Sequence, residues 1–155
     1  MSKAKICVSG HLGFIGSHLY RSLKELDFDV WGIDLKDEAD LKDVRHVYPK
    51  DFEGTDYIFH CAAQAKVPLS IERPEFTHAH NVDGTFRLLL AARDAHVKKV
   101  IYSASSSAYG EQKILPLKED MVPNPMNPYA VQKLIGEHYC KVFSSVYGLP
   151  TVSLR

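Results

Sequence analysis

The stretch Ile6-Cys7-Val8-Ser9-Gly10-His11-Leu12-Gly13-Phe14-Ile15-Gly16 decides the fold class of this 155-residue chain. Its first three residues form a short apolar run typical of a buried strand, and Ser9-Gly10 ends that run in a turn. From Phe14 onward, apolar residues at positions 15, 19, 23 and 26 mark one face of a helix. A strand, a glycine turn and a helix in this order predict a backbone that can hold a phosphate group at the helix N-terminus.

The same alternation of strands and helices continues to the end of the chain. We expect further strands at 30–33, 57–61, 100–102 and 151–154, and further helices at 79–95 and 129–147. Strands that alternate with helices of this length predict a parallel sheet covered on both faces. We therefore expect one α/β domain over residues 1–155, with a Rossmann-type doubly wound parallel sheet.

Composition and charge place the chain among ordinary globular proteins. Hydrophobic residues make up 45% and charged residues 25%, and the formal net charge is zero. A neutral chain has no field that favours nucleic acid or an anionic membrane, and no apolar run reaches membrane-spanning length. Cys7 and Cys61 lie in apolar runs far from each other and from Cys140, so we expect reduced thiols and a cytoplasmic protein.

The glycine turn has the spacing Gly-x-x-Gly-x-x-Gly, with Gly10, Gly13 and Gly16. Asp34 ends the next predicted strand, which suits a carboxylate that accepts hydrogen bonds from an adenosine ribose. The same charge would repel a 2′-phosphate, so we expect NAD rather than NADP. The alternative is a structural glycine turn followed by a solvated aspartate, although the order of strand, glycines, helix, strand and Asp argues against it.

A Tyr and a Lys four residues apart share one face of a helix, and the ammonium lowers the pKa of the phenol. Such a tyrosine can take a proton from a substrate hydroxyl near neutral pH. The spacing occurs three times: Tyr20/Lys24, Tyr109/Lys113 and Tyr129/Lys133. We favour Tyr129 and Lys133, because only this pair begins a helix after a strand that ends in hydroxyl groups.

That strand ends in Ser103, Ser105, Ser106 and Ser107, which either cap a loop or place one hydroxyl beside the tyrosine and the substrate. Three histidines, His60, His78 and His80, lack a metal-ligand pattern, so we interpret them as surface residues and expect no metal site. Asn81 could serve as a helix N-cap. The acidic segment around Asp40 could be a solvated loop.

With these residues in view, the chain resembles the extended short-chain dehydrogenase/reductase family, and within it the NAD-dependent nucleotide-sugar epimerases and dehydratases of the UDP-glucose 4-epimerase type. The motifs that carry the resemblance, besides the glycine turn, are 60–65 (His-Cys-Ala-Ala-Gln-Ala), 81–85 (Asn-Val-Asp-Gly-Thr), 105–110 (Ser-Ser-Ser-Ala-Tyr-Gly) and 127–129 (Asn-Pro-Tyr).

The resemblance implies a role for each matching residue. Tyr129 would be the general base, Lys133 would hold the nicotinamide ribose, Ser105 would be the Ser/Thr that assists catalysis, and Ser107 would approach the sugar. The residues that would contact NAD besides Tyr129 and Lys133 are Gly10, Gly13, Phe14, Ile15 and Gly16 at the pyrophosphate, Asp34 at the adenosine ribose, Asp40 and Leu41 at the adenine, and Ala62, Ala63 and Asn81 along the remaining cofactor.

The resemblance also implies a nucleotide-sugar substrate and a homodimer or higher oligomer. Two departures from the family pattern stand out. Asp34 and Asp40 are only six residues apart, so the usual helix between their strands is expected to be missing or vestigial. The half that grips the nucleotide sugar is expected to be absent. Two alternatives therefore stay open: an NAD-binding module without turnover, and a reductase of the same family that acts on a small carbonyl.

Overall fold

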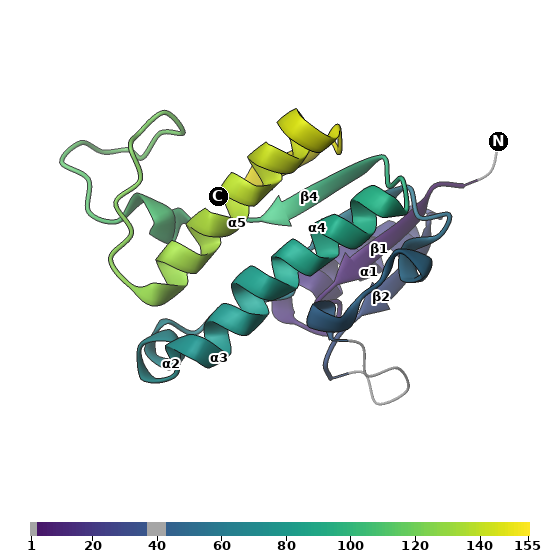
Figure 1. The fold of residues 1–155 in the computed structure, drawn as a ribbon, viewed down its shortest axis with the longest axis horizontal. Helices are drawn as coiled ribbons and strands as arrows, with labels where there is room; N and C mark the ends of the chain where they lie inside the picture. Colours follow the sequence, from purple (N-terminus) through teal and green to yellow (C-terminus); the bar gives the residue numbers. More distant parts are fainter. Residues whose placement is uncertain (1–2, 37–42) are drawn as a thin grey trace.

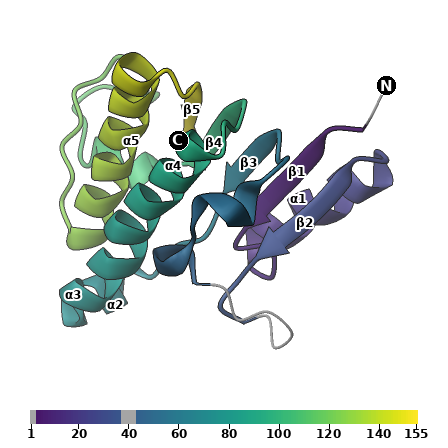
Figure 2. The same ribbon diagram turned by 45° about the vertical axis from the view of Figure 1, so that its right-hand side comes forward.

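The computed structural model describes residues 3–36 and 43–155, which form a five-stranded parallel sheet with helices on both faces (Figure 1, Figure 2). The strands are β1 (Lys5–Ser9), β2 (Asp29–Ile33), β3 (Tyr57–His60), β4 (Lys99–Ser103) and β5 (Thr151–Leu154). Their order in the sheet is β2-β1-β3-β4-β5, so the chain runs outward from β1 in both directions. This reversal defines a doubly wound sheet and confirms the predicted fold class.

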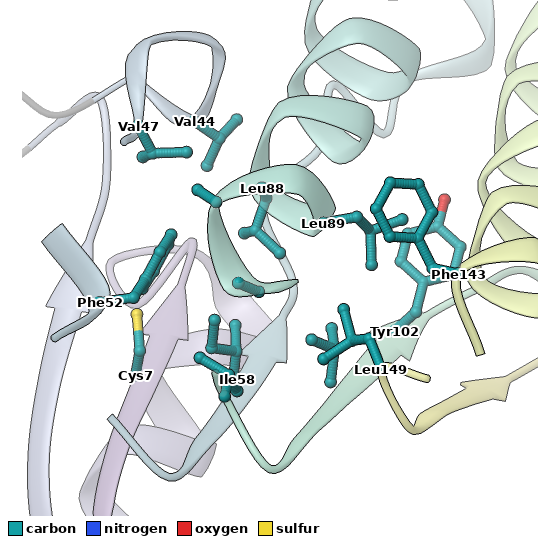
Figure 3. Close-up of a cluster of buried hydrophobic side chains, with 14 of the residues drawn as sticks. Cys7, Val44, Val47, Phe52, Ile58, Leu88, Leu89, Tyr102, Phe143 and Leu149 are labelled. Atoms are coloured by element: carbon teal, nitrogen blue, oxygen red, sulfur yellow. The ribbon is translucent and has the colours of Figure 1, made fainter. Parts of the chain in front are cut away.

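Alternating side chains assign each face of the sheet to its own helices. Ile6 and Val8 of β1 point to one face, where they pack with Leu23 of α1 (Phe14–Glu25). Cys7 points to the other face, into the larger core beneath α4 (Gly84–Asp94) and α5 (Pro128–Tyr147) (Figure 3). The buried members that Figure 3 labels are Cys7, Val44, Val47, Phe52, Ile58, Leu88, Leu89, Tyr102, Phe143 and Leu149.

The described part of the connection from β2 to β3 has two short turns in place of the crossover helix that was expected to be missing or vestigial. Its described residues, 43–56, carry only two short 3₁₀ helices, η1 (Val44–His46) and η2 (Pro49–Phe52), and no α-helix. These 3₁₀ helices supply Val44 and Phe52 to the core, so they cover the area beside α4. The packing that a full crossover helix would provide comes here from two turns.

The predicted helix at 79–95 is part of a longer helical run that begins earlier. Two short helices, α2 (Val67–Glu72) and α3 (Pro74–His78), precede a π-helical turn, η3 (Ala79–Asp83), which leads directly into α4. The periodicity of the chain did not predict α2 and α3, which are short and begin beside prolines. A further 3₁₀ helix, η4 (Ser106–Tyr109), follows β4.

Of the three cysteines, Cys7 and Cys140 are buried and Cys61 is only partly buried. None of the helices formed by residues 3–36 and 43–155 has both the length and the apolar composition needed to span a bilayer.

Candidate functional site

A cavity of about 450 Å³ lies at the carboxyl ends of β1, β2 and β3. This is the crevice in which doubly wound sheets bind their ligands. Its walls come from the glycine turn, the end of β2 and the segment after β3. The lining residues include Gly10, Gly13, Phe14, Asp34, Ala62, Ala63, Gln64 and His80. Six of these, all but Gln64 and His80, are among the residues for which the sequence predicted cofactor contact.

The glycine turn packs against the end of β3 without room for side chains. Gly10 has a φ of +77°, and a Cβ there would lie 2.7 Å from the backbone nitrogen of Ala62. A Cβ on Gly16, the third residue of α1, would overlap the carbonyl oxygen of Gly10. The first turn of α1 has neither a side-chain cap nor an acidic residue. Its N–H groups and the positive end of its dipole therefore suit an anion.

Asp34 ties the glycine turn to the end of β2. One carboxylate oxygen accepts a hydrogen bond from the backbone N–H of Leu12 at 3.0 Å, and the other accepts from the backbone N–H of Lys36 at 3.0 Å. The carboxylate therefore has a fixed orientation at the edge of the cavity. The predicted adenine contacts, Asp40 and Leu41, lie outside the described residues. Ile15 is largely exposed at the start of α1 and Gly16 is buried.

The start of α5 is held by several hydrogen bonds, which fix the position of Tyr129. Asn127 caps the helix, because its side-chain oxygen accepts from the N–H of Ala130 at 2.9 Å. The N–H of Tyr129 donates to the hydroxyl of Ser70 in α2 at 3.1 Å. Ser70 is fully buried and donates in turn to the carbonyl of Val67 at 2.7 Å. The unpredicted helix α2 is thus the support for the first turn of α5.

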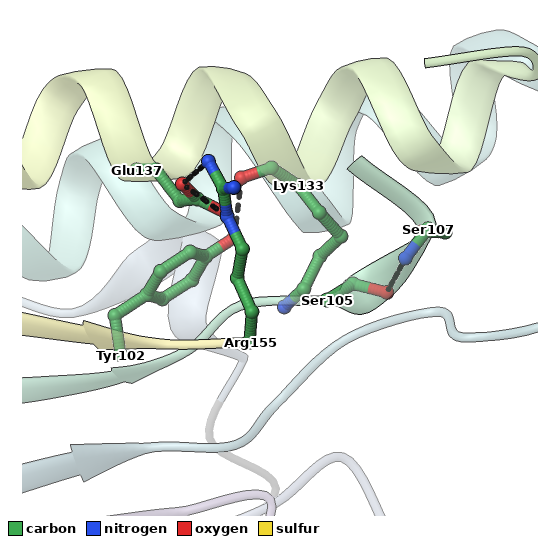
Figure 4. A network of polar contacts seen from close by, with 6 residues as sticks. All are labelled: Tyr102, Ser105, Ser107, Lys133, Glu137 and Arg155. Atoms are coloured by element: carbon green, nitrogen blue, oxygen red, sulfur yellow. Dashed lines mark hydrogen bonds and ion pairs between the residues drawn. The ribbon is translucent and has the colours of Figure 1, made fainter. Parts of the chain in front are cut away.

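Lys133 lies one turn after Tyr129, with its side chain directed from α5 toward the loop after β4 (Figure 4). Its side chain is buried, and the ammonium lies 4.4 Å from the centre of the Tyr102 ring. Burial lowers the pKa of Lys133 to about 8. Gly136 allows this packing, since a Cβ there would overlap the hydroxyl of Tyr102, which donates to the Lys133 carbonyl oxygen at 3.4 Å.

Ser105 and Ser107 form a hydrogen-bonded pair in the loop after β4. Their hydroxyl oxygens are 2.7 Å apart, and Ser105 also accepts from the N–H of Ser107 at 3.2 Å (Figure 4). Ser105 caps η4, so the interpretation of a serine that caps the loop is confirmed for this residue. Beyond the loop, Arg155 makes a bidentate ion pair with Glu137 and stacks on the Tyr109 ring.

The interpretation of His60 and His80 as surface residues is wrong. His60 is buried at the end of β3, where it contacts Ser9 and Thr85. Thr85 donates its only hydroxyl hydrogen to the Asn81 carbonyl at 2.7 Å, so its oxygen accepts from Nε2–H of His60. The Nδ1 of His60 therefore carries no hydrogen and accepts from the hydroxyl of Ser9. Burial, together with the Lys133 ammonium, lowers the pKa of His60 to about 3 and keeps the ring neutral.

His80 is buried beside the cavity, and its Nδ1 lies 2.7 Å from the carbonyl oxygen of Phe76. Of the three histidines, only His78 is exposed, as expected. The two buried histidines were misassigned because periodicity alone does not distinguish a polar residue packed inside the fold from a surface residue.

Asn81 is not an N-cap, because it lies inside the continuous helical run from α3 to α4. Its buried amide contacts Gln64, which lines the cavity.

The two other Tyr/Lys pairs lie in other environments. Tyr20 packs against His11 and contacts the Val30 carbonyl, while the Lys24 ammonium lies over its ring. Tyr109 is buried at the end of η4, and Gly110, with a φ of +60°, ends that helix before the exposed Lys113. Of the three lysines, only Lys133 is buried, whereas Lys24 and Lys113 are exposed.

Comparison with known proteins agrees with this architecture. The model of the NAD dependent epimerase/dehydratase family matches residues 6–155. The chain belongs to this family. A UDP-glucose 4-epimerase from Lactobacillus helveticus is 34% identical over 166 residues, which cover 97% of this chain and 50% of the relative. The chain thus spans about half the length of the curated relatives it matches.

Solved structures of the family share the fold. The UDP-N-acetylglucosamine 4-epimerase from Methanobrevibacter ruminantium M1, in complex with UDP-N-acetylmuramic acid, has a TM-score of 0.93 and 36% identity. The match covers 100% of this chain and 55% of that one. The UDP-glucose 4-epimerase from Brucella ovis, in complex with NAD, has a TM-score of 0.91 and 32% identity over 98% of this chain and 51% of that one. The resemblance stated from the sequence motifs is therefore confirmed.

Proposed function

We propose that this chain binds NAD and forms the cofactor half of a nucleotide-sugar epimerase or dehydratase. The observation that supports this best is the buried Lys133, which places an ammonium near the carboxyl ends of the strands, one turn from Tyr129. Relatives named as UDP-glucose 4-epimerases and a family neighbour in complex with NAD agree with the proposal.

The residues around the cavity suit this cofactor. The side-chain-free surface at Gly10 and Gly13 and the uncapped start of α1 would receive the pyrophosphate. Asp34 would accept hydrogen bonds from the adenosine ribose and disfavour a 2′-phosphate. Ala62 and Ala63 would lie along the cofactor, since their small side chains leave the cavity open. Phe14, Ile15 and Gly16 would complete the pyrophosphate site, and Asn81 would support it through Gln64.

Tyr129 and Lys133 would carry the acid–base part of the reaction. The bound nicotinamide would supply the hydride chemistry, as acceptor and later donor of a hydride at a sugar carbinol carbon. The phenol oxygen of Tyr129 would take the proton of the substrate hydroxyl and give it back. The Lys133 ammonium would hold the nicotinamide ribose. Ser105 would orient the substrate hydroxyl, and Ser107 would approach the sugar.

Titration with NAD, followed by addition of UDP-glucose, tests this function. We expect saturable NAD binding and a rise in the absorbance of reduced nicotinamide when the sugar is added. NAD binding with no change upon addition of any nucleotide sugar would support the second candidate, cofactor binding without turnover. Oxidation or reduction of a simple carbonyl compound would favour a small-carbonyl reductase instead.

We also propose that α4 and α5 mediate a homodimer or higher oligomer of a cytoplasmic protein. The two helices lie side by side on one face of the sheet (Figure 1, Figure 2). Val131, Val142 and Val146 are exposed at helical spacing along α5. Reduced thiols, as the spacing of the cysteines predicts, suit the cytoplasm. Light scattering should show a dimer or larger species that Val146→Asp dissociates, whereas a wild-type monomer at micromolar concentration would contradict the proposal.

A further inference from the structure

Gln132 lies between Tyr129 and Lys133 in the first turns of α5, and its amide is fully hydrogen-bonded although it is buried. Its Nε2 donates to the hydroxyl of Thr77 at 3.0 Å and to the carbonyl of Pro74 at 3.5 Å. Its Oε1 accepts from the side-chain nitrogen of Asn81 at 2.9 Å. All polar atoms of this amide have a partner, so its orientation is unique.

Asn81 continues this chain of hydrogen bonds to the wall of the cavity. Its Oδ1 accepts from the N–H of Gln64 at 2.7 Å, and its Nδ2 donates to the Gln64 carbonyl at 3.1 Å as well as to Gln132. Asn81 therefore holds both backbone groups of a residue that lines the cavity. The hydrogen-bond chain from the backbone of Gln64 to the first turns of α5 thus consists of two buried amide side chains, those of Asn81 and Gln132.

The far end of the same network reaches the glycine turn. The Asn81 carbonyl accepts from Thr85, which contacts His60, which contacts Ser9 at the end of β1. Ser9 in turn accepts from the N–H of Ala62 at 3.4 Å. The network is neutral, because His60 is uncharged and every other member is an amide or a hydroxyl. A fully satisfied neutral network inside a core specifies one arrangement of the elements that it joins.

We propose that Gln132 is a positioning residue, which together with Asn81 and Thr77 holds Tyr129 and Lys133 at a fixed place relative to the cavity wall at Gln64. The importance of Gln132 for activity rests on the proposed function, in which NAD binds in the cavity and Tyr129 transfers the proton. Helix propensity alone does not require a glutamine here, because leucine or methionine forms helix as well. The contacts of both ends of the amide are what require it.

The test compares variants that remove these contacts with a matched variant elsewhere. Gln132→Met keeps the length and helix propensity of the side chain but removes all of its hydrogen bonds. Gln112→Met is the control, because Gln112 also donates to two backbone carbonyls, those of Tyr109 and Val122, but lies in a loop outside the network. Thr77→Val removes one partner of Gln132, and Thr77→Ser restores the hydroxyl.

Three readouts are measured on the wild type and on each variant. Amide hydrogen exchange in the first two turns of α5 should be about tenfold faster in Gln132→Met, since two or more buried hydrogen bonds are lost. The NAD dissociation constant should rise roughly tenfold. The Lys133 titration, followed by the NMR resonance of its Cε, should move from a pKa of about 8 toward the ordinary value of 10.5, because the ammonium regains water.

The Lys133 titration separates positioning from mere destabilisation, because a less stable but correctly folded protein keeps the same environment around its ammonium. The groups that face Lys133 are Cys61 and His60 from β3 and its end, Tyr102 from β4, and Glu137 and Cys140 from α5. None of them is altered in these variants. Thr77→Val should show the same changes at smaller size, and Thr77→Ser should behave as the wild type.

The proposal is overturned if Gln132→Met matches Gln112→Met in α5 exchange and in the Lys133 titration. If Gln132→Met does not fold, the Thr77→Val and Thr77→Ser pair decides the question by the same readouts, and identical behaviour of that pair overturns the proposal. Exchange and titration are measured without cofactor, so they test the positioning directly. A wild-type chain that binds no NAD would refute the proposed function independently of them.

Discussion

Replacing Gly10 by alanine should destabilise the protein, because the added Cβ would have both an unfavourable φ and no free space. The φ of +77° costs a residue with a Cβ about 1–2 kcal/mol. The Cβ would also lie 2.7 Å from the Ala62 nitrogen and 2.8 Å from its Cα, both backbone atoms of the β3 segment that cannot rotate away. Overpacking of this kind adds about 1–3 kcal/mol.

The total is about 3 kcal/mol, which for a domain of this size lowers the melting temperature by roughly 6–12 °C. Gly54→Ala is the control, because Gly54 has a φ of +70° and nothing within 4 Å of its Cβ position. It carries the backbone cost without the close contact, and any stabilisation through the unfolded chain is common to both variants. The difference between the variants, about 1–3 kcal/mol, therefore measures the packing of the turn against β3.

Urea unfolding and NAD titration of both variants measure these quantities. Gly10→Ala should lose more than about tenfold in NAD affinity, because Ala62 must move out of the cavity wall, while Gly54→Ala should bind as the wild type. Equal unfolding free energies for the two variants would refute the close approach of the turn to β3. Wild-type NAD affinity in Gly10→Ala would refute the placement of the cofactor at this turn.

Three further predictions concern the charged and phenolic groups of the site. Tyr129→Phe should lower any sugar turnover by about 10²–10⁴-fold with NAD affinity nearly unchanged, whereas Tyr20→Phe should leave the rate intact; equal losses in both would contradict the assignment. Lys133 has a pKa of about 8 when folded and about 10.5 when unfolded, so the unfolded chain binds more protons between these pH values. The wild type should therefore gain up to about 3 kcal/mol of stability relative to Lys133→Met as the pH rises through this range. Parallel curves of the urea midpoint against pH for the two proteins would show that Lys133 is not buried as a charge. Asp34→Asn should raise the affinity for NADP relative to NAD by roughly tenfold, and an unchanged ratio in parallel titrations would exclude Asp34 from the ribose site.

The sequence predicted the elements whose patterns are local. The glycine turn, the five strands and α1 and α5 follow from apolar periods and breakers, which act over a few neighbouring residues. It also predicted a missing or vestigial helix after Asp34, and the described residues 43–56 have no α-helix. α2 and α3 were missed, because each is about one or two turns long and has a proline in its first two residues.

The polar interior was the part that the sequence could not predict. His60 and Gln132 are polar residues whose burial depends on partners 25 and 51 residues away, Thr85 and Asn81. No local period marks such a pair. The signal that could have found Gln132 was its place between Tyr129 and Lys133, on a helix whose neighbouring positions were already assigned to the site.

The π-helical turn η3 shifts the rotational phase of one long helical rod. On its N-terminal side, Thr77 faces the start of α5, and within the turn Asn81 does the same. On its C-terminal side, Leu88 and Leu89 face the sheet. Each residue of an α-helix advances the chain by roughly 100°, so deleting one residue from 79–83 would rotate one of these two sets away from its partners. We therefore expect the length of this segment to tolerate far less change than its composition. Proteins with a single-residue insertion or deletion here should keep an intact sheet but lose a working site.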